Sequence, residues 1–403
     1  MKNKNILISG AGIAGLTLAY WLKQHGFVPT VVEKNPVLRT GGYNIDIRGV
    51  AVDVIKWMKL YPAILDARTA IEKTVCVDDT GGEVTELSAH VSGSRSDGDL
   101  EIMRGDLCQI LHRAIDDVEC IFGDTITKIS ENSDGVYVEF EVSAPRQFDL
   151  VIGADGLHST VRKVAFGDES QFLRELGFYI SVFPIPNFLN LERSEIEYNA
   201  PQKFVSCYKS QKDPNAKACF AFPATSKHST VRNPKEQKKM LEEAFADAGW
   251  KIPRILSAMK ESTDFYFDSA AQIHMPHWSK GRIALVGDAG YGPSPLSGQG
   301  TSIALVGAYV LASELAKAGG EYKIAFSQYE QGLRPFIKKN QELAEMGITL
   351  MGEPDSSWIV GLHHHLLEIM PEAWAHILKN WSVTRTAEAA NALVLKEYGN
   401  ENS

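Results

Sequence analysis

One glycine-rich stretch near the start of the chain most constrains the fold. A short apolar run at residues 5–8 passes directly into Gly10-Ala11-Gly12-Ile13-Ala14-Gly15, and apolar residues at helical spacing follow. A second apolar run at residues 28–32 ends at Glu33. This order predicts a βαβ unit in which the glycines admit a pyrophosphate to the helix N-terminus and the acid binds a ribose hydroxyl. The stretch therefore indicates a dinucleotide site.

Composition excludes several classes of function. A chain of 403 residues with 44% hydrophobic and 23% charged residues is typical of a soluble protein with two domains and room for a third, helical part. The net charge of −9 argues against binding to nucleic acid or to an acidic membrane surface. The five cysteines are scattered and lack metal-ligand spacing, so no disulfide framework or metal site is expected. The longest apolar segment, residues 303–312, is too short to span a bilayer.

Two further segments carry charges that could reach a bound cofactor. The loop at residues 39–49 is rich in glycine and contains Arg39, Asp46 and Arg48, although composition alone also allows a solvated surface loop. Arg104 lies between a short strand at residues 101–103 and an amphipathic helix beginning at Leu107. A cation at a helix start is well placed to contact a phosphate or a ribityl chain.

Two later apolar strands end in an acid beside glycine. Residues 148–152 lead to Gly153-Ala154-Asp155-Gly156, and residues 282–286 lead to Gly287-Asp288. Open α/β sheets bind their ligands at the carboxyl ends of the strands, so Asp155 and Asp288 are candidate site residues. The segment that follows Asp288 opens a long helix, predicted at residues 302–318, whose N-terminal amides can face an electron-rich ring.

Between these strands the chain changes character. Residues 164–275 contain short aromatic-rich runs that predict an antiparallel sheet interrupted by a helix near residues 236–248. These aromatic side chains either fill the core or line a substrate pocket, and Phe220, Phe222 and Tyr266 are the candidate substrate contacts. Residues 321–403 are predicted to be helical and to end in a docked helix near residues 386–398, with Val383, Ala387, Ala390 and Val394 on one face. The adjacent residues His363-His364-His365 would point in different directions on a helix, which argues against a metal site.

The three motifs Gly10–Gly15, Gly153–Arg162 and Arg282–Gly300 occur in an order that resembles the group A FAD-dependent monooxygenases over roughly residues 1–315. The chain is more similar still to the tetracycline-inactivating flavin monooxygenases, the tetracycline destructases. That similarity covers the loop ending Asp46-Ile47-Arg48-Gly49, residues 101–107, Ser294–Gly300 and the helical C-terminal extension.

The resemblance implies an α/β fold with three parts. It gives a Rossmann-like FAD-binding domain at residues 1–163 and 276–320, an antiparallel-sheet substrate domain at residues 164–275, and a C-terminal helical region at residues 321–403. The implied enzyme is a cytoplasmic monomer that uses FAD, NADPH and O2 to oxidise a tetracycline-like polyketide through a C4a-hydroperoxyflavin. The alternatives are a hydroxylase of another phenol or polyketide, or a non-oxygenating reductase of the same fold.

The resemblance also assigns cofactor contacts, and no catalytic side chain, because the flavin performs the chemistry. Pyrophosphate and adenosine contacts fall at the N-terminal unit, flavin contacts at the Asp46 loop and Arg104, and a position near both flavin and NADPH at Asp155. The ribityl region falls at Asp288 and the ring at Pro295–Gly300. The complete predicted set is Gly10, Gly12, Ala14, Gly15, Glu33, Lys34, Arg39, Asp46, Arg48, Arg104, Leu107, Asp155, Asp288, Pro295, Gly298 and Gly300.

Overall fold

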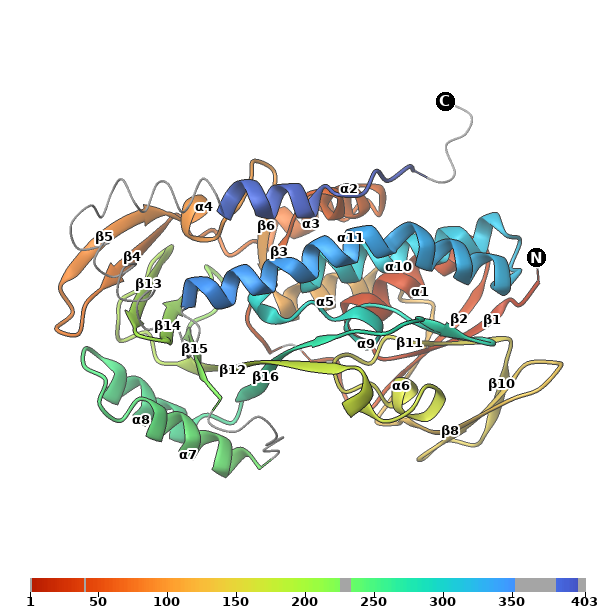
Figure 1. The fold of residues 1–403 in the computed structure, drawn as a ribbon, viewed down its shortest axis with the longest axis horizontal. Coiled ribbons are helices and arrows are strands. Elements are labelled where there is room, and N and C mark those ends of the chain that lie inside the picture. The colour runs from red at the N-terminus through yellow and green to blue at the C-terminus, as the bar shows by residue number, and fades with distance from the viewer. Residues whose placement is uncertain (1, 40, 225–232, 352–381, 398–403) are drawn as a thin grey trace.

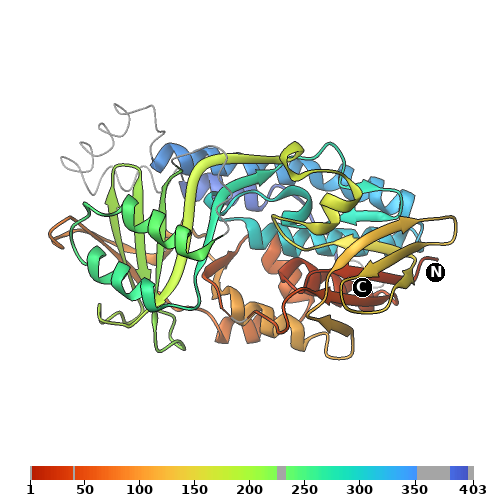
Figure 2. The same ribbon diagram turned by 90° about the horizontal axis from the view of Figure 1, so that it is seen from below.

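The protein is described by a computed structural model that covers residues 2–39, 41–224, 233–351 and 382–397. Two sheets lie at opposite ends of an elongated molecule (Figure 1). Helices α10 (Gly300–Lys317) and α11 (Tyr322–Met351) run along one side, and strands β12 (Leu173–Ile185) and β16 (Tyr266–Ile273) run between the two ends (Figure 2).

The first sheet carries the N-terminal glycine motif. Its six strands lie in the order β17-β18-β11-β1-β2-β7, and all neighbouring pairs are parallel except β17 with β18. The central strands are continuous apolar runs, since helices such as α1 (Ile13–Gln24) cover the sheet. The strands are β1 (Asn5–Ser9), β2 (Val28–Glu33), β7 (Glu119–Phe122), β11 (Leu150–Gly153), β17 (Ser279–Lys280) and β18 (Ile283–Leu285).

Smaller elements connect the strands of the first sheet. Strands β3 (Asn44–Ile47) and β6 (Leu100–Met103) form a ribbon, and β8 (Ile126–Glu131), β9 (Val136–Phe140) and β10 (Arg146–Phe148) form a three-stranded sheet. The short helices are α2 (Val50–Trp57), α3 (Tyr61–Asp66), α4 (Ala89–Ser92), α5 (Arg104–Arg113), α6 (Thr160–Ala165) and α9 (Asp288–Tyr291). Single 3-10 turns lie at η1 (Glu169–Gln171) and η2 (Pro295–Ser297).

The second sheet has seven strands in the order β16-β12-β15-β14-β13-β4-β5, and only β13 with β4 is a parallel pair. Helices α7 (Pro234–Ala244) and α8 (Ile252–Glu261) cover one of its faces. The strands not yet given are β4 (Lys73–Val77), β5 (Glu83–Ser88), β13 (Ser194–Ala200), β14 (Lys203–Tyr208) and β15 (Ala216–Pro223).

The location of β4 and β5 corrects the predicted domain division. These strands lie within residues 1–163, which we assigned to the FAD-binding domain, but they pair into the second sheet. Strand β4 pairs with β13, for example through Thr74 and Glu195. A pairing between segments so far apart in the chain leaves no local pattern in either one. The other predicted boundaries stay predictions.

The C-terminal helix docks, but not where it was predicted. The helix covers residues 382–390, and its buried side chains are Ser382, Thr386, Ala389 and Ala390. Val394, which was predicted on the docked face, is 88% exposed because the chain has left the helix by that point. The tail is held in a non-helical path by the Tyr309 hydroxyl, which donates to the carbonyl of Lys396 at 2.6 Å. Residues 363–365 lie outside the described residues.

The fold class is confirmed: a Rossmann-like domain, a largely antiparallel second sheet, and C-terminal helices. Across the parts of the chain that the structure describes, no helix has the length and apolar character needed to cross a membrane. The five cysteines all lie in the described part of the chain, and none of them forms a disulfide there.

Candidate functional site

The three glycines of the N-terminal motif have different tasks. Gly10 has φ of +106°, and a Cβ there would lie 2.6 Å from the carbonyl oxygen of Ala154. A Cβ at Gly15 would lie 1.9 Å from the carbonyl oxygen of Gly10. These two positions need glycine so that the loop can pack against the protein itself. A Cβ at Gly12 would meet only Arg104 Nη2, at 3.9 Å, so Gly12 borders open space that a ligand can enter.

The loop leads into a helix end suited to phosphate. No side chain caps the N-terminus of α1, and its first amides precede the intrahelical ladder. Glu33 ends β2 beside this loop, where its carboxylate accepts from the backbone N–H of Ala11 at 2.9 Å and of Asn35 at 3.0 Å. The site therefore pairs anion-binding amides with a fixed carboxylate.

Arg104 lies next to the same loop. It is the first residue of α5, and its N–H donates to the carbonyl of Tyr43 at 2.9 Å. Gly42 leaves room for its stem, because a Cβ at Gly42 would be 3.3 Å from Arg104 Cβ. The guanidinium thus extends toward Gly12, where it can neutralise a bound phosphate.

Asp288 reaches the loop from the other side. A Cβ at Gly287 would lie 3.0 Å from Ala14 Cβ, which places the neighbouring Asp288 close to the N-terminus of α1. Asp288 is accessible to solvent, but many protein atoms surround its carboxylate. This crowding raises the pKa of Asp288 to about 6, while the nearby charge of Arg104 lowers it. An accessible carboxylate at this depth is available to accept hydrogen bonds from a ligand.

The segment before α10 presents an open edge. Pro295 and Gly298 are exposed, and a Cβ at Gly300 would have nothing within 4 Å. The hydroxyl of Ser297 stabilises the turn by donating to the carbonyl of Ser294 at 2.8 Å. No side chain caps α10 either, so the positive end of a long helix faces this open edge.

Asp46 and Arg48 are already engaged with each other. Arg48 Nη2 lies 2.6 Å from Asp46 Oδ2, and Arg95 Nε lies 2.7 Å from Asp46 Oδ1. Burial raises the pKa of Asp46, but the two guanidinium groups outweigh it and hold the pKa below its ordinary value. Arg48 also approaches the open segment before α10, since a Cβ at Gly298 would lie 3.9 Å from Arg48 Nη2. Sequence reasoning missed Arg95.

Three further predicted contacts have side chains that are engaged within the protein. The Asp155 carboxylate accepts from Ser159 Oγ at 2.5 Å and from the Thr160 N–H at 2.8 Å, so it caps α6. Its backbone nevertheless borders the glycine loop, where a Cβ at Gly10 would be 3.0 Å from Asp155 Cα. Leu107 is completely buried in the main core. Ala14 is 7% exposed and packs toward Gly287.

The remaining predicted residues, Lys34 and Arg39, lie just beyond β2 and are exposed. Arg39 Nη2 donates to Asn35 Oδ1 at 3.3 Å. Neither side chain is held toward the glycine loop by a contact that the structure shows.

The second sheet has two faces, and the three candidate substrate contacts are divided between them. Phe220 and Phe222 point toward α7 and α8, where Phe220 lies edge-on to Phe245 with ring centroids 4.9 Å apart. Tyr266 points to the opposite face and lies 5.5 Å from the ring of Tyr43, beside the open segment. Tyr266 therefore stays a predicted substrate contact, whereas Phe220 and Phe222 are core side chains and the prediction for them is corrected.

The inner face holds residues that the sequence did not single out. It is apolar and partly accessible, and it packs with Leu296 of the open segment. Strand alternation could have grouped these residues by face, as Cys219 and Ala221 alternate with Phe220 and Phe222 on β15, but it does not tell which face points inward. They are Phe178, Ile180, Val182, Phe204, Cys219 and Ala221.

These segments together fit FAD. Amides at α1 and the Arg104 guanidinium suit a pyrophosphate, and Glu33 and Asp288 offer acceptors for ribose and ribityl hydroxyls. Gly12, Gly298 and Gly300 leave space that a Cβ would occupy. Among the residues that the structure describes, no group of three or more histidine, cysteine or acidic side chains could hold a metal ion.

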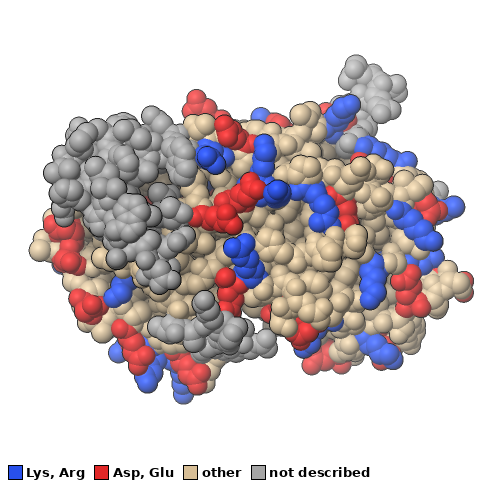
Figure 3. Space-filling view, in the orientation of Figure 1, with Lys and Arg blue, Asp and Glu red and all other residues tan. Residues whose placement is uncertain are grey.

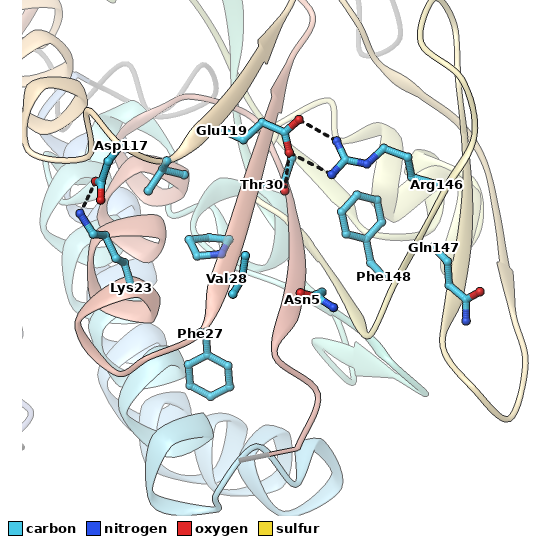
Figure 4. A pocket seen from close by; sticks show the side chains of 12 residues that line it. Asn5, Lys23, Phe27, Val28, Thr30, Asp117, Glu119, Arg146, Gln147 and Phe148 are labelled. Carbon is cyan, nitrogen blue, oxygen red and sulfur yellow. Dashed lines mark hydrogen bonds and ion pairs between the residues drawn. The ribbon is translucent and has the colours of Figure 1, made fainter.

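Two hollows of about 500 Å³ lie away from this site. One is at the amino ends of β1 and β2, opposite the glycine loop, where Lys23 pairs with Asp117 and Arg146 with Glu119 (Figure 4). The other lies around Tyr322 and Glu330. Neither contains the segments described above. Basic and acidic side chains are interspersed on the face in Figure 3, which shows no broad basic patch.

Comparisons with known proteins agree with the geometry. The family description "FAD binding domain" matches residues 112–342, and "NAD(P)-binding Rossmann-like domain" matches residues 8–55. A flavin-dependent monooxygenase from an unknown prokaryotic organism is 46% identical over 338 residues, which are 84% of this chain and 88% of the relative. The chain belongs to the flavin-dependent monooxygenases.

Two solved structures are similar over nearly the whole length of this monooxygenase. The tetracycline destructase Tet(55) is 40% identical, with a TM-score of 0.86 over 98% of this chain and 99% of that chain. The tetracycline destructase Tet(51) is also 40% identical, with a TM-score of 0.85 over 99% and 100% of the two chains. The predicted family, enzyme class and FAD cofactor are confirmed.

Proposed function

We propose that this monooxygenase uses NADPH and O2 to oxidise a tetracycline-like polyketide. One oxygen atom enters the substrate, the other leaves as water, and NADPH becomes NADP⁺. Bound FAD supplies the transfer of reducing equivalents and the activation of oxygen. The chain supplies binding, orientation and exclusion of water.

The observation that carries the proposal is the similarity to two tetracycline destructases over at least 98% of this chain. It therefore includes the second sheet and the C-terminal helix, which lie outside the glycine motifs. A fused-ring substrate needs a broad apolar wall near the flavin edge. The inner face of the second sheet provides such a wall, beside Leu296 of the open segment.

Tyr266 is the proposed ring contact on that wall. Its aromatic ring packs against Tyr43 of the loop that precedes β3. Tyr266 therefore lies where the second sheet meets the candidate FAD site. The next residue, Phe267, points to the other face and packs toward the core under α7 and α8. These neighbours have opposite orientations and form a matched pair for mutation.

The test is a coupled assay on the purified, FAD-loaded protein. Tetracycline should accelerate NADPH oxidation and O2 uptake, and mass spectrometry should show a product that has gained oxygen. Tyr266→Ala should raise KM for tetracycline at least several-fold, whereas Phe267→Ala should lower the melting temperature with less effect on KM. Replacing NADPH with NADH measures the preference between the two nucleotides.

Two results would redirect the proposal. Stimulated NADPH oxidation with tetracycline recovered unchanged would make the compound only an uncoupling effector. Activity on a simple phenol without any response to tetracyclines would identify a hydroxylase of another substrate. Flavin reduction without O2-dependent product would contradict oxygenation itself.

A further inference from the structure

The structure links the C-terminal helix to the ring side of the cofactor site through one buried arginine. Arg48 is 4% exposed, and its guanidinium contacts three acceptors. Beyond its ion pair with Asp46, Nη1 donates to the carbonyl of Ser94 at 2.6 Å, and Nη2 donates to the carbonyl of Gly93 at 2.6 Å. Two backbone carbonyls therefore determine where this cation lies.

The arginine also has a donor to spare. Its Nε is buried and has no hydrogen-bond partner within the described residues. The same side chain lies against Gly298. This glycine is exposed and has φ of +64°. A buried, unpaired N–H costs stability unless an acceptor completes it. The nitrogen that borders Gly298 is Nη2 rather than Nε, so Arg48 presents the charge of its guanidinium to an electron-rich ring edge there.

The carbonyls that hold Arg48 belong to a segment anchored by the C-terminal helix. The Ser94 hydroxyl forms a hydrogen bond with the Ser382 hydroxyl in the first turn of helix 382–390. Ser94 has φ of +52°, an uncommon backbone conformation for a residue with a side chain. A contact that restrains Ser94 therefore also restrains the carbonyl that Arg48 uses.

The helix touches the arginine from its other end as well. Gly49 follows Arg48, and a Cβ at Gly49 would lie 2.6 Å from the carbonyl oxygen of Ala390. In Figure 1 the helix runs from near α4 toward α2. Both ends of the helix thus meet residues that adjoin Arg48, one through Ser94 and one through Gly49.

We propose that helix 382–390 positions Arg48 against the flavin ring through Ser382 and Ser94. In this arrangement Ser94 and Ser382 are positioning residues, and Arg48 is the residue that touches the cofactor. Docking of the helix then raises affinity for FAD and changes the electronic surroundings of its ring. The inference rests on FAD binding and is independent of which substrate is oxidised.

The test measures FAD binding to the full-length apoprotein by quenching of flavin fluorescence. Ser382→Ala and Ser94→Ala should each raise the Kd for FAD by about 3- to 10-fold, the effect of losing one hydrogen bond. Ser382→Thr keeps the hydroxyl and should restore binding. Thr384→Ala removes an exposed hydroxyl from the same helix and should leave the Kd unchanged.

A double-mutant cycle separates this linkage from general loosening of the fold. In an Arg48→Lys background, which cannot bind two carbonyls with one planar group, Ser382→Ala should have no further effect on the Kd. The visible absorption spectrum of bound flavin should shift in Ser382→Ala and not in Thr384→Ala. The proposal is overturned if Ser382→Ala matches Thr384→Ala in both readouts, or if its effect persists undiminished in the Arg48→Lys background.

Discussion

Substituting alanine at Gly12 should weaken cofactor binding strongly without damaging the fold. Gly12 has φ of −83°, which any residue adopts, and the nearest atom to an added Cβ is 3.9 Å away. A glycine replaced by alanine at such a position gains about 0.4–1 kcal/mol, because the unfolded chain loses freedom. The apoprotein should therefore melt at the same temperature or slightly higher.

The substitution should reduce the free energy of FAD binding, because the methyl group would occupy the space that admits the pyrophosphate. If the displaced phosphate loses two hydrogen bonds to the helix amides, each about 1.5–3 kcal/mol for a charged acceptor, binding weakens by about 3–6 kcal/mol. That corresponds to about 10²- to 10⁴-fold in the Kd. Fluorescence titration of the apoprotein with FAD measures it directly.

Gly15→Ala is the matched comparison. Its Cβ would lie 1.9 Å from the carbonyl of Gly10, against an ordinary contact of at least 3.4 Å, so the loop must shift by more than 1 Å. We expect a loss of apoprotein stability of about 1–3 kcal/mol or more, seen as a lower melting temperature. Normal FAD affinity in Gly12→Ala, or equal melting losses in both variants, would refute the assignment of one glycine to the ligand and the other to packing.

Three further predictions concern charge and packing. Because the pKa of Asp288 is raised to about 6, FAD affinity should fall as the pH drops through 6, and Asp288→Asn should remove that dependence in the same titration. Phe220→Ala should cost about 3–5 kcal/mol in chemical denaturation, because this ring is fully buried, and FAD affinity per folded molecule should not change. The carboxylates of Asp268 and Glu169 raise the pKa of His158 from 6.5 to about 9, so the stabilisation is complete below pH 6.5 and is lost as the pH rises through 9. The melting temperature should decline across that window in the wild type, and a decline of equal size in His158→Gln would contradict this assignment.

Residues whose positions depend on local geometry could be predicted from the sequence. The spacing from Gly10 to Gly15 and the acid at Glu33 lie within one βαβ unit, so their relation follows from strand and helix periodicity. Asp288 was accessible to the same reasoning because it ends a buried strand of the same sheet. In each case the chain itself carries the residue to the sheet edge where ligands bind.

Competition between nearby partners was harder to foresee. Asp155 also ends a central strand, but its carboxylate caps α6 because the free amides of that helix lie within reach. Asp46 likewise has Arg95 beside it, contributed by a segment that follows the second-sheet strand β5. The possible donors and acceptors can be read from a sequence. Which of them come within hydrogen-bonding distance is decided only by folding.

Periodicity and glycine spacing over short stretches were enough to predict the dinucleotide-binding unit, the order of the motifs and the two-sheet α/β class. The tertiary structure decided which face of the second sheet Phe220 and Tyr266 occupy, since alternation fixes relative but not absolute orientation until α7 and α8 cover one face. It also brought β4 to β13, and helix 382–390 to Gly49 and Ser94. Such contacts join segments far apart in the chain, and their free energy comes from burial that neither segment can achieve alone.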